Sequence, residues 1–189
     1  IDQAQAATIT TLFNTGLDTA GAVGTGAADA NYTLLNPSGA TIATRAIGIG
    51  TSPASIYNGS AGGQGDDTKS AWIGPDNAGL NGVPGNYTYR TTFDLAGLVA
   101  STANISGKWN TDNSGVQVLL NGTAVSGATN SGFGSGFSTF NIASGFTSGI
   151  NTLDFIVNNA GTSSNPTALR VEYASAMADA ASTAVPEPS

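Results

Sequence analysis

The feature that most restricts the fold of this chain is a two-residue alternation in its central part. Residues 86–95 read NYTYRTTFDL, and the less polar side chains occupy every second position: Tyr87, Tyr89, Thr91, Phe93 and Leu95. Successive side chains of an extended strand point to opposite faces of a sheet, so this pattern predicts a half-buried β-strand. Such segments recur along the chain without intervening helical patterns, and we therefore expect an all-β fold.

Four further segments predict strands, although the first of them alternates less cleanly: 104–112, 115–127, 151–159 and 167–174. Their in-phase side chains are Ile105 and Trp109; Val116, Val118 and Leu120; Leu153, Phe155 and Val157; and Leu169, Val171 and Tyr173. Within the second segment, Asn121-Gly122 is the strongest short-range signal for a hairpin, because both residues tolerate positive φ.

These strands favour a β-sandwich, most specifically a jelly roll, as a single domain over residues 1–175. Residues 8–60 are expected to add three or four strands, around TITTLF, ANYTLL and TIATRAIGI. A β-solenoid is the alternative for a chain rich in Gly, Asn and Thr, but it requires a fixed internal repeat, which the sequence lacks. Residues 174–182 have the pattern of one or two helical turns, within a linker expected over residues 176–189.

The charge of the chain excludes several classes of partner. Only 9% of the residues are charged and the net charge is −7, with five scattered basic residues: Arg45, Lys69, Arg90, Lys108 and Arg170. Without a basic stripe, the chain is not expected to bind nucleic acid or an anionic membrane surface. Asn, Ser, Thr and Gly must supply most of its polar surface, which suits adhesive or sugar-facing modules.

The chain contains neither cysteine nor histidine. This composition excludes disulfides, thiolate metal sites and the Ser-His-Asp and Cys-His arrangements of nucleophilic catalysis. A glycosidase needs two carboxylates that flank one bond, but Glu172 and Glu187 are the only glutamates, and no spacing singles out a pair of aspartates. We therefore expect no enzymatic activity; a carboxylate-dependent glycosidase or lyase remains the alternative.

Aromatic and amide side chains at predicted loops are the candidate ligand-binding residues. Trp72 stands at a loop edge, where an indole can stack on a sugar ring, and its alternative role is to fill one end of the core. Trp109 is expected in the core. The polar candidates are Asp76, Asn77, Asp112, Asn113, Asn158 and Asn159, whose carboxylates and amides can bind sugar hydroxyls or, alternatively, form turns.

Five segments carry a resemblance to known proteins: SAWIGPDNAG, GNYTYRTTFDL, ISGKWNTDNSGVQVLLNGTAV, SGFTSGINTLDFIVNNAG and NPTALRVEYA. Together they span residues 70–173 and resemble the extracellular domain of bacterial PEP-CTERM proteins. More distantly, they are similar to the galactose-binding-like jelly rolls that accompany β-galactosidase-type glycosidases. In those domains too, a Trp-containing segment precedes a YR-x-x-F strand, an Asp-bearing strand, an LNG hairpin and an N-x-L-x-F-x-V-x-N strand.

The resemblance also explains the last residues of the sequence. Val185, Pro186, Glu187 and Pro188 match the family's sorting motif, which is followed in the family by a hydrophobic helix and a basic tail and is handled by an exosortase. We expect the natural chain to continue past Ser189 with about 20 apolar residues and then Arg or Lys. We also expect residue 1 to be a mature N-terminus, since no signal peptide is visible.

Jelly rolls of the galactose-binding type often hold a structural calcium ion, and the resemblance places its ligands at Asp29 and Glu172. Asp66 and Asp67 are alternative ligands, and Glu172 could instead pair with Arg90 or Arg170. The expected function is that of a non-catalytic, secreted or cell-surface protein of a Gram-negative bacterium. Its expected partner is the extracellular polysaccharide of the biofilm matrix, bound weakly; the further alternative is a calcium-stabilised scaffold.

Overall fold

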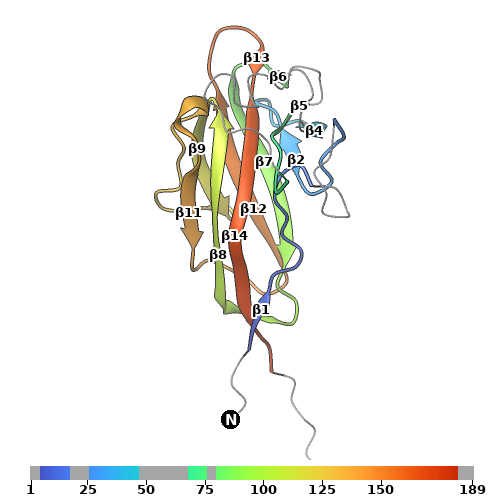
Figure 1. The fold of residues 1–189 in the computed structure, drawn as a ribbon, viewed down its shortest axis with the longest axis vertical. Helices are drawn as coiled ribbons and strands as arrows, with labels where there is room; N and C mark the ends of the chain where they lie inside the picture. The colour runs from blue at the N-terminus through green and yellow to red at the C-terminus, as the bar shows by residue number, and fades with distance from the viewer. Residues whose placement is uncertain (1–4, 18–25, 47–67, 76–79, 183–189) are drawn as a thin grey trace, which may run out of the picture.

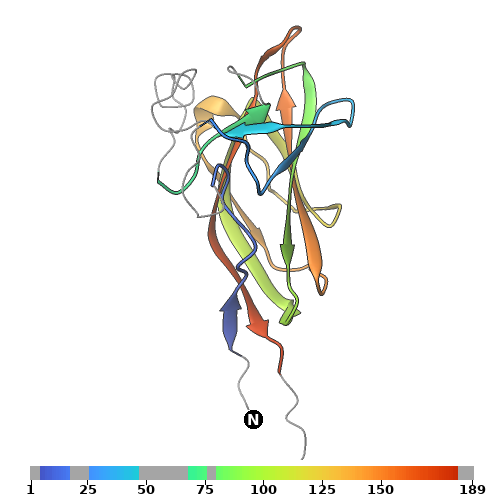
Figure 2. The ribbon, with the colours of Figure 1, turned by 90° about the vertical axis from the view of Figure 1, so that its right-hand side faces the viewer.

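The computed structural model describes residues 5–17, 26–46, 68–75 and 80–182. These residues form two six-stranded antiparallel sheets that pack face to face, as Figure 2 shows edge-on. The prediction of an all-β sandwich is thereby confirmed. Asp76, Asn77, Asp66, Asp67 and the sorting motif Val185–Pro188 lie outside the described residues.

The first sheet, called the β14 sheet here, contains the two longest strands (Figure 1). Its order is β11 (Ser138–Ile142), β8 (Leu98–Asp112), β14 (Ala168–Ala180), β5 (Ile73–Pro75) and β4 (Thr44–Ala46). Strand β1 (Ala6–Thr8) completes it by pairing with the last residues of β14.

The second sheet, called the β12 sheet, runs in the order β10 (Thr123–Ala124), β9 (Ser114–Leu120), β12 (Ile150–Asn159), β7 (Gly85–Asp94), β2 (Thr33–Leu35) and β3 (Thr41–Ile42). A two-stranded ribbon of β6 (Asn81–Gly82) and β13 (Asn165–Pro166) closes one end of the sandwich, opposite the end where β1 meets β14 (Figure 1). The only helical element in the described ranges is a 3₁₀ turn, η1 (Phe133–Ser135), so no described helix has the length to span a membrane.

The alternation of residues 86–95 has the predicted consequence. Tyr87, Tyr89, Thr91, Phe93 and Leu95 are all buried between the sheets. The centre of the core is aromatic: the Phe155 ring lies 5.6 Å from Trp109 and 5.8 Å from Phe140, and Phe140 lies 6.1 Å from Tyr173. Gly115 makes room for the indole, because a Cβ there would lie 2.6 Å from Trp109 Cη2.

The hairpin at Asn121-Gly122 is confirmed, and it is as short as predicted. Leu120 pairs with Thr123, and the two turn residues have φ angles of 50° and 79°. Positive φ at both central positions is the signature of a type I′ turn, whose twist matches that of the flanking strands.

The prediction that Val116 points into the core with Val118 and Leu120 is wrong. Opposite β12, Ile156 pairs with Gln117 and Val157 pairs with Gly115, so Val116 is the extra residue of a β-bulge. The bulge turns its side chain to solvent, where it is 42% exposed.

The expected helical turns over residues 174–182 are also wrong, and the sandwich extends beyond residue 175. Strand β14 continues to Ala180 because both of its edges are paired there: Met177, Ala178 and Asp179 with β1, and Asp179 and Ala180 with β8. These long-range pairs supply the backbone partners that a short helix would have supplied locally. The first strand also differs from the prediction, since β1 ends at Thr8, where the TITTLF segment begins.

Candidate functional site

Two of the predicted polar pairs come together at the end of the sandwich that carries the β6–β13 ribbon. Asp112 and Asn113 stand where β8 ends, and Asn158 and Asn159 stand where β12 ends. The Asn113 amide donates to the Asn158 carbonyl at 3.0 Å, so the two strand ends are directly joined.

The side chains of these residues make hydrogen bonds within the fold. Asn113 Oδ1 accepts a hydrogen bond from the Ala160 amide at 2.7 Å, and Asn158 Nδ2 donates to Asn86 Oδ1 at 2.8 Å. Asn159 is fully buried and donates to the Gly82 carbonyl at 2.8 Å. These contacts give the three asparagines roles within the fold, whereas the buried Asn159 Oδ1 has no hydrogen-bond partner among the described atoms. Their ligand-binding role stays a prediction.

Packing against neighbouring side chains also determines the position of Trp72. Its side chain has no exposed surface, and it packs with Leu80, Ala168 and Phe133 in a small cluster beside the main core. Of the two roles considered for Trp72, this position matches the filling of one end of the core, because a buried ring presents no face to a ligand. Trp109 is buried as expected.

Glu172 is the centre of an ion cluster on the outer face of the β14 sheet. Its Oε1 accepts from Arg170 Nη2 at 3.0 Å and from Ser70 Oγ at 2.9 Å, and its Oε2 pairs with Lys108 Nζ at 2.9 Å. Arg170 is buried, and the Phe137 ring lies 4.2 Å from Lys108 Nζ. Of the alternatives for Glu172, the pair with Arg170 is therefore the one that forms, and two adjacent cations disfavour calcium here.

Asp29 is buried and holds two loops together. Its Oδ2 accepts from the Gly16 amide at 2.6 Å, and its Oδ1 accepts from the Asn31 amide at 2.7 Å. Burial raises the pKa of this carboxyl, although the backbone donors oppose the shift. Within the described ranges, no three acidic side chains gather in a way that could hold a metal ion.

One polar side chain that the sequence did not single out makes five hydrogen bonds. Asn130 is buried; its Nδ2 donates to the Trp109 carbonyl, the Gly136 carbonyl and Ser138 Oγ, each at 3.0 Å. Its Oδ1 accepts from Thr111 Oγ1 at 3.1 Å and from the Gly132 amide at 2.8 Å. The NSGFGSG stretch at 130–136 predicts only a turn, and nothing in it distinguishes Asn130 from the other asparagines.

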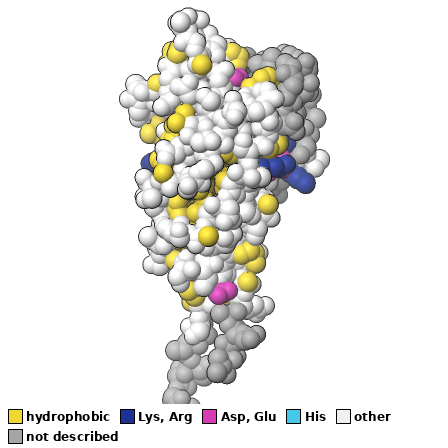
Figure 3. Space-filling model, turned by 90° about the vertical axis from the view of Figure 1, so that its left-hand side faces the viewer, with side chains coloured by type: hydrophobic (Ala, Val, Ile, Leu, Met, Phe, Trp, Pro, Cys, Tyr) yellow, Lys and Arg dark blue, Asp and Glu magenta, His cyan; other side chains and the backbone are white. Residues whose placement is uncertain are grey.

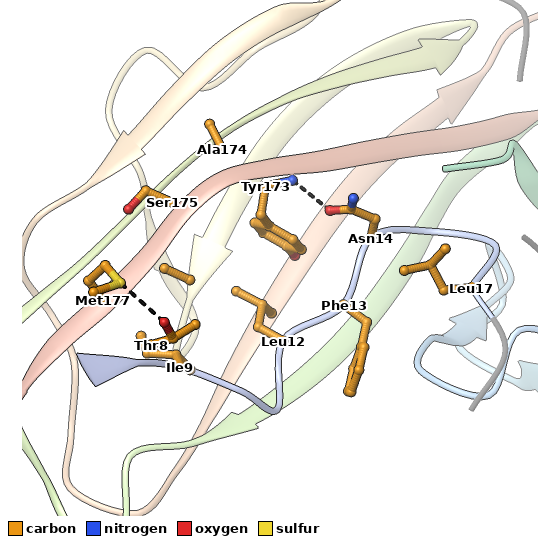
Figure 4. A pocket seen from close by; sticks show the side chains of 11 residues that line it. Thr8, Ile9, Leu12, Phe13, Asn14, Leu17, Tyr173, Ala174, Ser175 and Met177 are labelled. Carbon is orange, nitrogen blue, oxygen red and sulfur yellow. Dashed lines mark hydrogen bonds between the residues drawn. The ribbon is translucent and has the colours of Figure 1, made fainter. Parts of the chain in front are cut away.

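One groove beside β14 is lined mostly by apolar side chains. It has a volume of about 390 Å³ and lies between β14 and the segment that follows β1. Figure 4 shows Leu12 and Tyr173 facing each other within it, whereas Phe13 points away from β14. Two of its polar side chains are engaged: Asn14 Oδ1 accepts from the Tyr173 amide at 2.7 Å, and Thr8 Oγ1 donates to Met177 Sδ at 3.6 Å.

Two further cavities are lined by described residues. One, of about 440 Å³, lies beside the β6–β13 ribbon and includes Asn36, Asn81 and Tyr87. The other, of about 270 Å³, lies on the outer face of the β14 sheet next to the Glu172 cluster and includes Lys69, Lys108 and Thr139.

Buried tyrosines predict that the protein loses stability in alkali. Tyr32 and Tyr173 share a hydrogen bond of 3.1 Å between their hydroxyls, and burial raises the pKa of Tyr32, Tyr89 and Tyr173 above the usual value. Above about pH 10 the unfolded chain releases phenolic protons that the folded chain retains, so the free energy of unfolding falls as pH rises. Urea midpoints measured from pH 8 to pH 12, followed with phenolate absorbance, should show ionisation of these tyrosines coinciding with unfolding. Titration of all five tyrosines near pH 10 in the folded protein would contradict this expectation.

Comparison with known proteins finds no matching family model, no matching curated protein and no matching solved structure.

Proposed function

We propose that this chain is a non-catalytic β-sandwich, of the jelly-roll type, that acts outside the cell in a polysaccharide matrix. Its role is to hold matrix material together through weak contacts with sugars. Delivery to the cell surface depends on an exosortase, which reads the motif at Val185, Pro186, Glu187 and Pro188. The resemblance of these residues and of residues 70–173 to PEP-CTERM proteins supports the proposed location.

The observation that carries the proposal is the uncharged polar character of the surface. On the side of the molecule that carries β9 and β11, most of the surface is neither charged nor hydrophobic, and the few Lys and Arg side chains lie at its margins (Figure 3). Hydroxyl and amide groups on a rigid sheet exchange hydrogen bonds with sugar hydroxyls without attracting or repelling charged ligands.

The buried carboxylates support a binding role over a catalytic one. Asp154 forms two hydrogen bonds of 2.8 Å with Arg90, Glu172 is held by Lys108 and Arg170, and Asp29 accepts from backbone amides. A general acid in a glycosidase needs a carboxyl that can hold and deliver a proton to the leaving group. The oxygens of Asp154 and Glu172 are instead occupied by hydrogen bonds and ion pairs with Arg90, Lys108 and Arg170.

The proposal is tested with immobilised neutral polysaccharides, such as dextran and a β-glucan, and the purified folded chain. We expect weak, reversible retention that changes less than about twofold between 50 mM and 500 mM NaCl, because exposed ion pairs, which salt screens, make no contribution. A heat-unfolded sample of the same chain is the control. Absence of retention on every neutral polysaccharide, or release of reducing sugar from any of them, would contradict the proposal.

A further inference from the structure

The turn at Asn121-Gly122 has a covalent chemistry of its own, besides its role in the hairpin. An asparagine that precedes a glycine deamidates readily, because glycine has no side chain to hinder attack by its backbone nitrogen on the neighbouring carboxamide. The chain has three such pairs, which begin at Asn58, Asn81 and Asn121. The last of them forms the two-residue turn between β9 and β10, where both residues are exposed to water.

Three hydrogen bonds hold the Asn121 carboxamide against the loop between β11 and β12. Its Nδ2 donates to the Gly145 carbonyl at 3.1 Å and to Asn151 Oδ1 at 2.8 Å, and its Oδ1 accepts from the Thr152 amide at 2.9 Å. The Asn121 backbone amide adds a bond of 2.8 Å to the Thr152 carbonyl. All of these partners lie outside the hairpin, so they tie the turn to a different part of the chain.

The acceptor on Asn151 is itself fixed. Asn151 is fully buried, and its Nδ2 donates to the Thr147 carbonyl at 2.7 Å and to the Gly149 carbonyl at 2.9 Å. Its Oδ1 accepts from the Thr147 amide at 2.9 Å as well as from Asn121. Turning the Asn151 amide over would break these bonds, so Asn151 offers Asn121 an acceptor and not a donor.

We infer that Asn121 is a modification site at which the fold controls deamidation. In this reaction the Gly122 nitrogen gives up its proton and bonds to Asn121 Cγ, the Cγ–Nδ2 bond breaks, and Nδ2 leaves as ammonia. Water then opens the resulting succinimide to aspartate or isoaspartate, and nothing is oxidised or reduced. Because Nδ2 is the atom that leaves, its hydrogen bonds to Gly145 and Asn151 must be given up before the reaction can finish. The closed hairpin therefore slows the reaction.

The product cannot restore the lost contacts. A carboxylate at position 121 has no donor, so it would face the Gly145 carbonyl and Asn151 Oδ1 with oxygen against oxygen. Isoaspartate also adds one methylene to the backbone of a two-residue turn, whose geometry fixes the pairing of β9 with β10. Conversion of Asn121 would thus release the hairpin from the loop between β11 and β12.

The test follows conversion of Asn121 by peptide mapping and mass spectrometry at pH 8 and 37 °C, in the folded chain and in the chain unfolded in guanidinium chloride. We expect the reaction to be at least about tenfold slower in the folded chain, because several hydrogen bonds must open first. In Asn151→Ser, which withdraws the acceptor from Asn121 Nδ2, this difference should shrink severalfold. Equal rates in the folded and unfolded wild-type chain would overturn the inference, as would an unchanged difference in folded Asn151→Ser.

Asn121→Asp provides a second reading if Asn151→Ser does not fold, because it carries the aspartate product from the start. We expect its urea midpoint to lie below that of the wild-type chain and below that of Asn158→Asp, which makes the same chemical change at a single exposed hydrogen bond. A midpoint equal to that of the wild-type chain would show that the product does restore the contacts, contrary to the inference. No sugar enters these measurements, so their outcome is independent of the proposed function.

Discussion

Replacing Glu172 by glutamine should lower the free energy of unfolding by about 3–5 kcal/mol, the usual loss when one partner of a buried ion pair is removed. Glu172 supplies the negative charge that Lys108 and the buried Arg170 share. Glutamine keeps the size of the side chain but not this charge, so both cations would remain on the sheet without their shared counter-charge. Urea unfolding followed by tryptophan fluorescence measures the effect.

The matched control for this variant is Asp94→Asn, which removes one negative charge at a partly exposed strand end. Asp94 Oδ1 accepts only the nearby Ala96 amide in the described contacts, so we expect a loss below about 1 kcal/mol. The double variant Glu172→Met with Arg170→Met should recover much of the stability, because removal of both charges avoids the cost of burying one of them. A loss of less than 1 kcal/mol for Glu172→Gln would show that the cluster is not effectively buried.

Replacing Asn130 by aspartate should lower the free energy of unfolding by on the order of 4 kcal/mol, because buried groups that lose their partners each cost about 1–3 kcal/mol. The Asn130 amide nitrogen donates to two carbonyls and one hydroxyl. A carboxylate oxygen in its place accepts hydrogen bonds but donates none, so it would face the Trp109 and Gly136 carbonyls with the wrong charge. The loss should be smaller at pH 3 than at pH 7, since a protonated carboxyl regains one donor.

Asn158→Asp is the control with the same chemical change. The Asn158 amide makes one exposed hydrogen bond, to Asn86 Oδ1, and the Asn86 amide can turn over and donate to the new carboxylate. We expect a change below about 1 kcal/mol in the same urea experiment. If the two variants lose equal stability, the network around Asn130 does not contribute in the way its geometry indicates.

The strands that the sequence predicted best are those in which one face is buried between the sheets and the other is more accessible, although Asp154 is buried on the outer face of β12. Alternation over residues 86–95 and 151–159 directly reports which side chains face the other sheet, and their pattern of burial follows it. The turn at Asn121-Gly122 was equally predictable, since positive φ is a local property of those two residues.

Val116 and residues 176–180 show where local patterns fail. The β-bulge at Val116 depends on how β9 meets β12, and the extension of β14 depends on β1, which lies about 170 residues away in the sequence. A short window of sequence shows neither β12 nor β1 as the partner strand. Alternation alone therefore placed Val116 on the wrong face, and local spacing predicted helical turns where β14 continues as a strand.

For the candidate site, composition alone determined that catalysis through His or Cys is impossible and that an all-β chain must cover itself with amides and hydroxyls. The tertiary structure decided which of those groups are used internally. It buried Trp72, gave Asn113, Asn158 and Asn159 hydrogen bonds within the fold, and brought Lys69 and Lys108 together beside Glu172. The physical reason is that burial and charge pairing depend on residues distant in the chain, whereas composition and periodicity are properties of the chain itself.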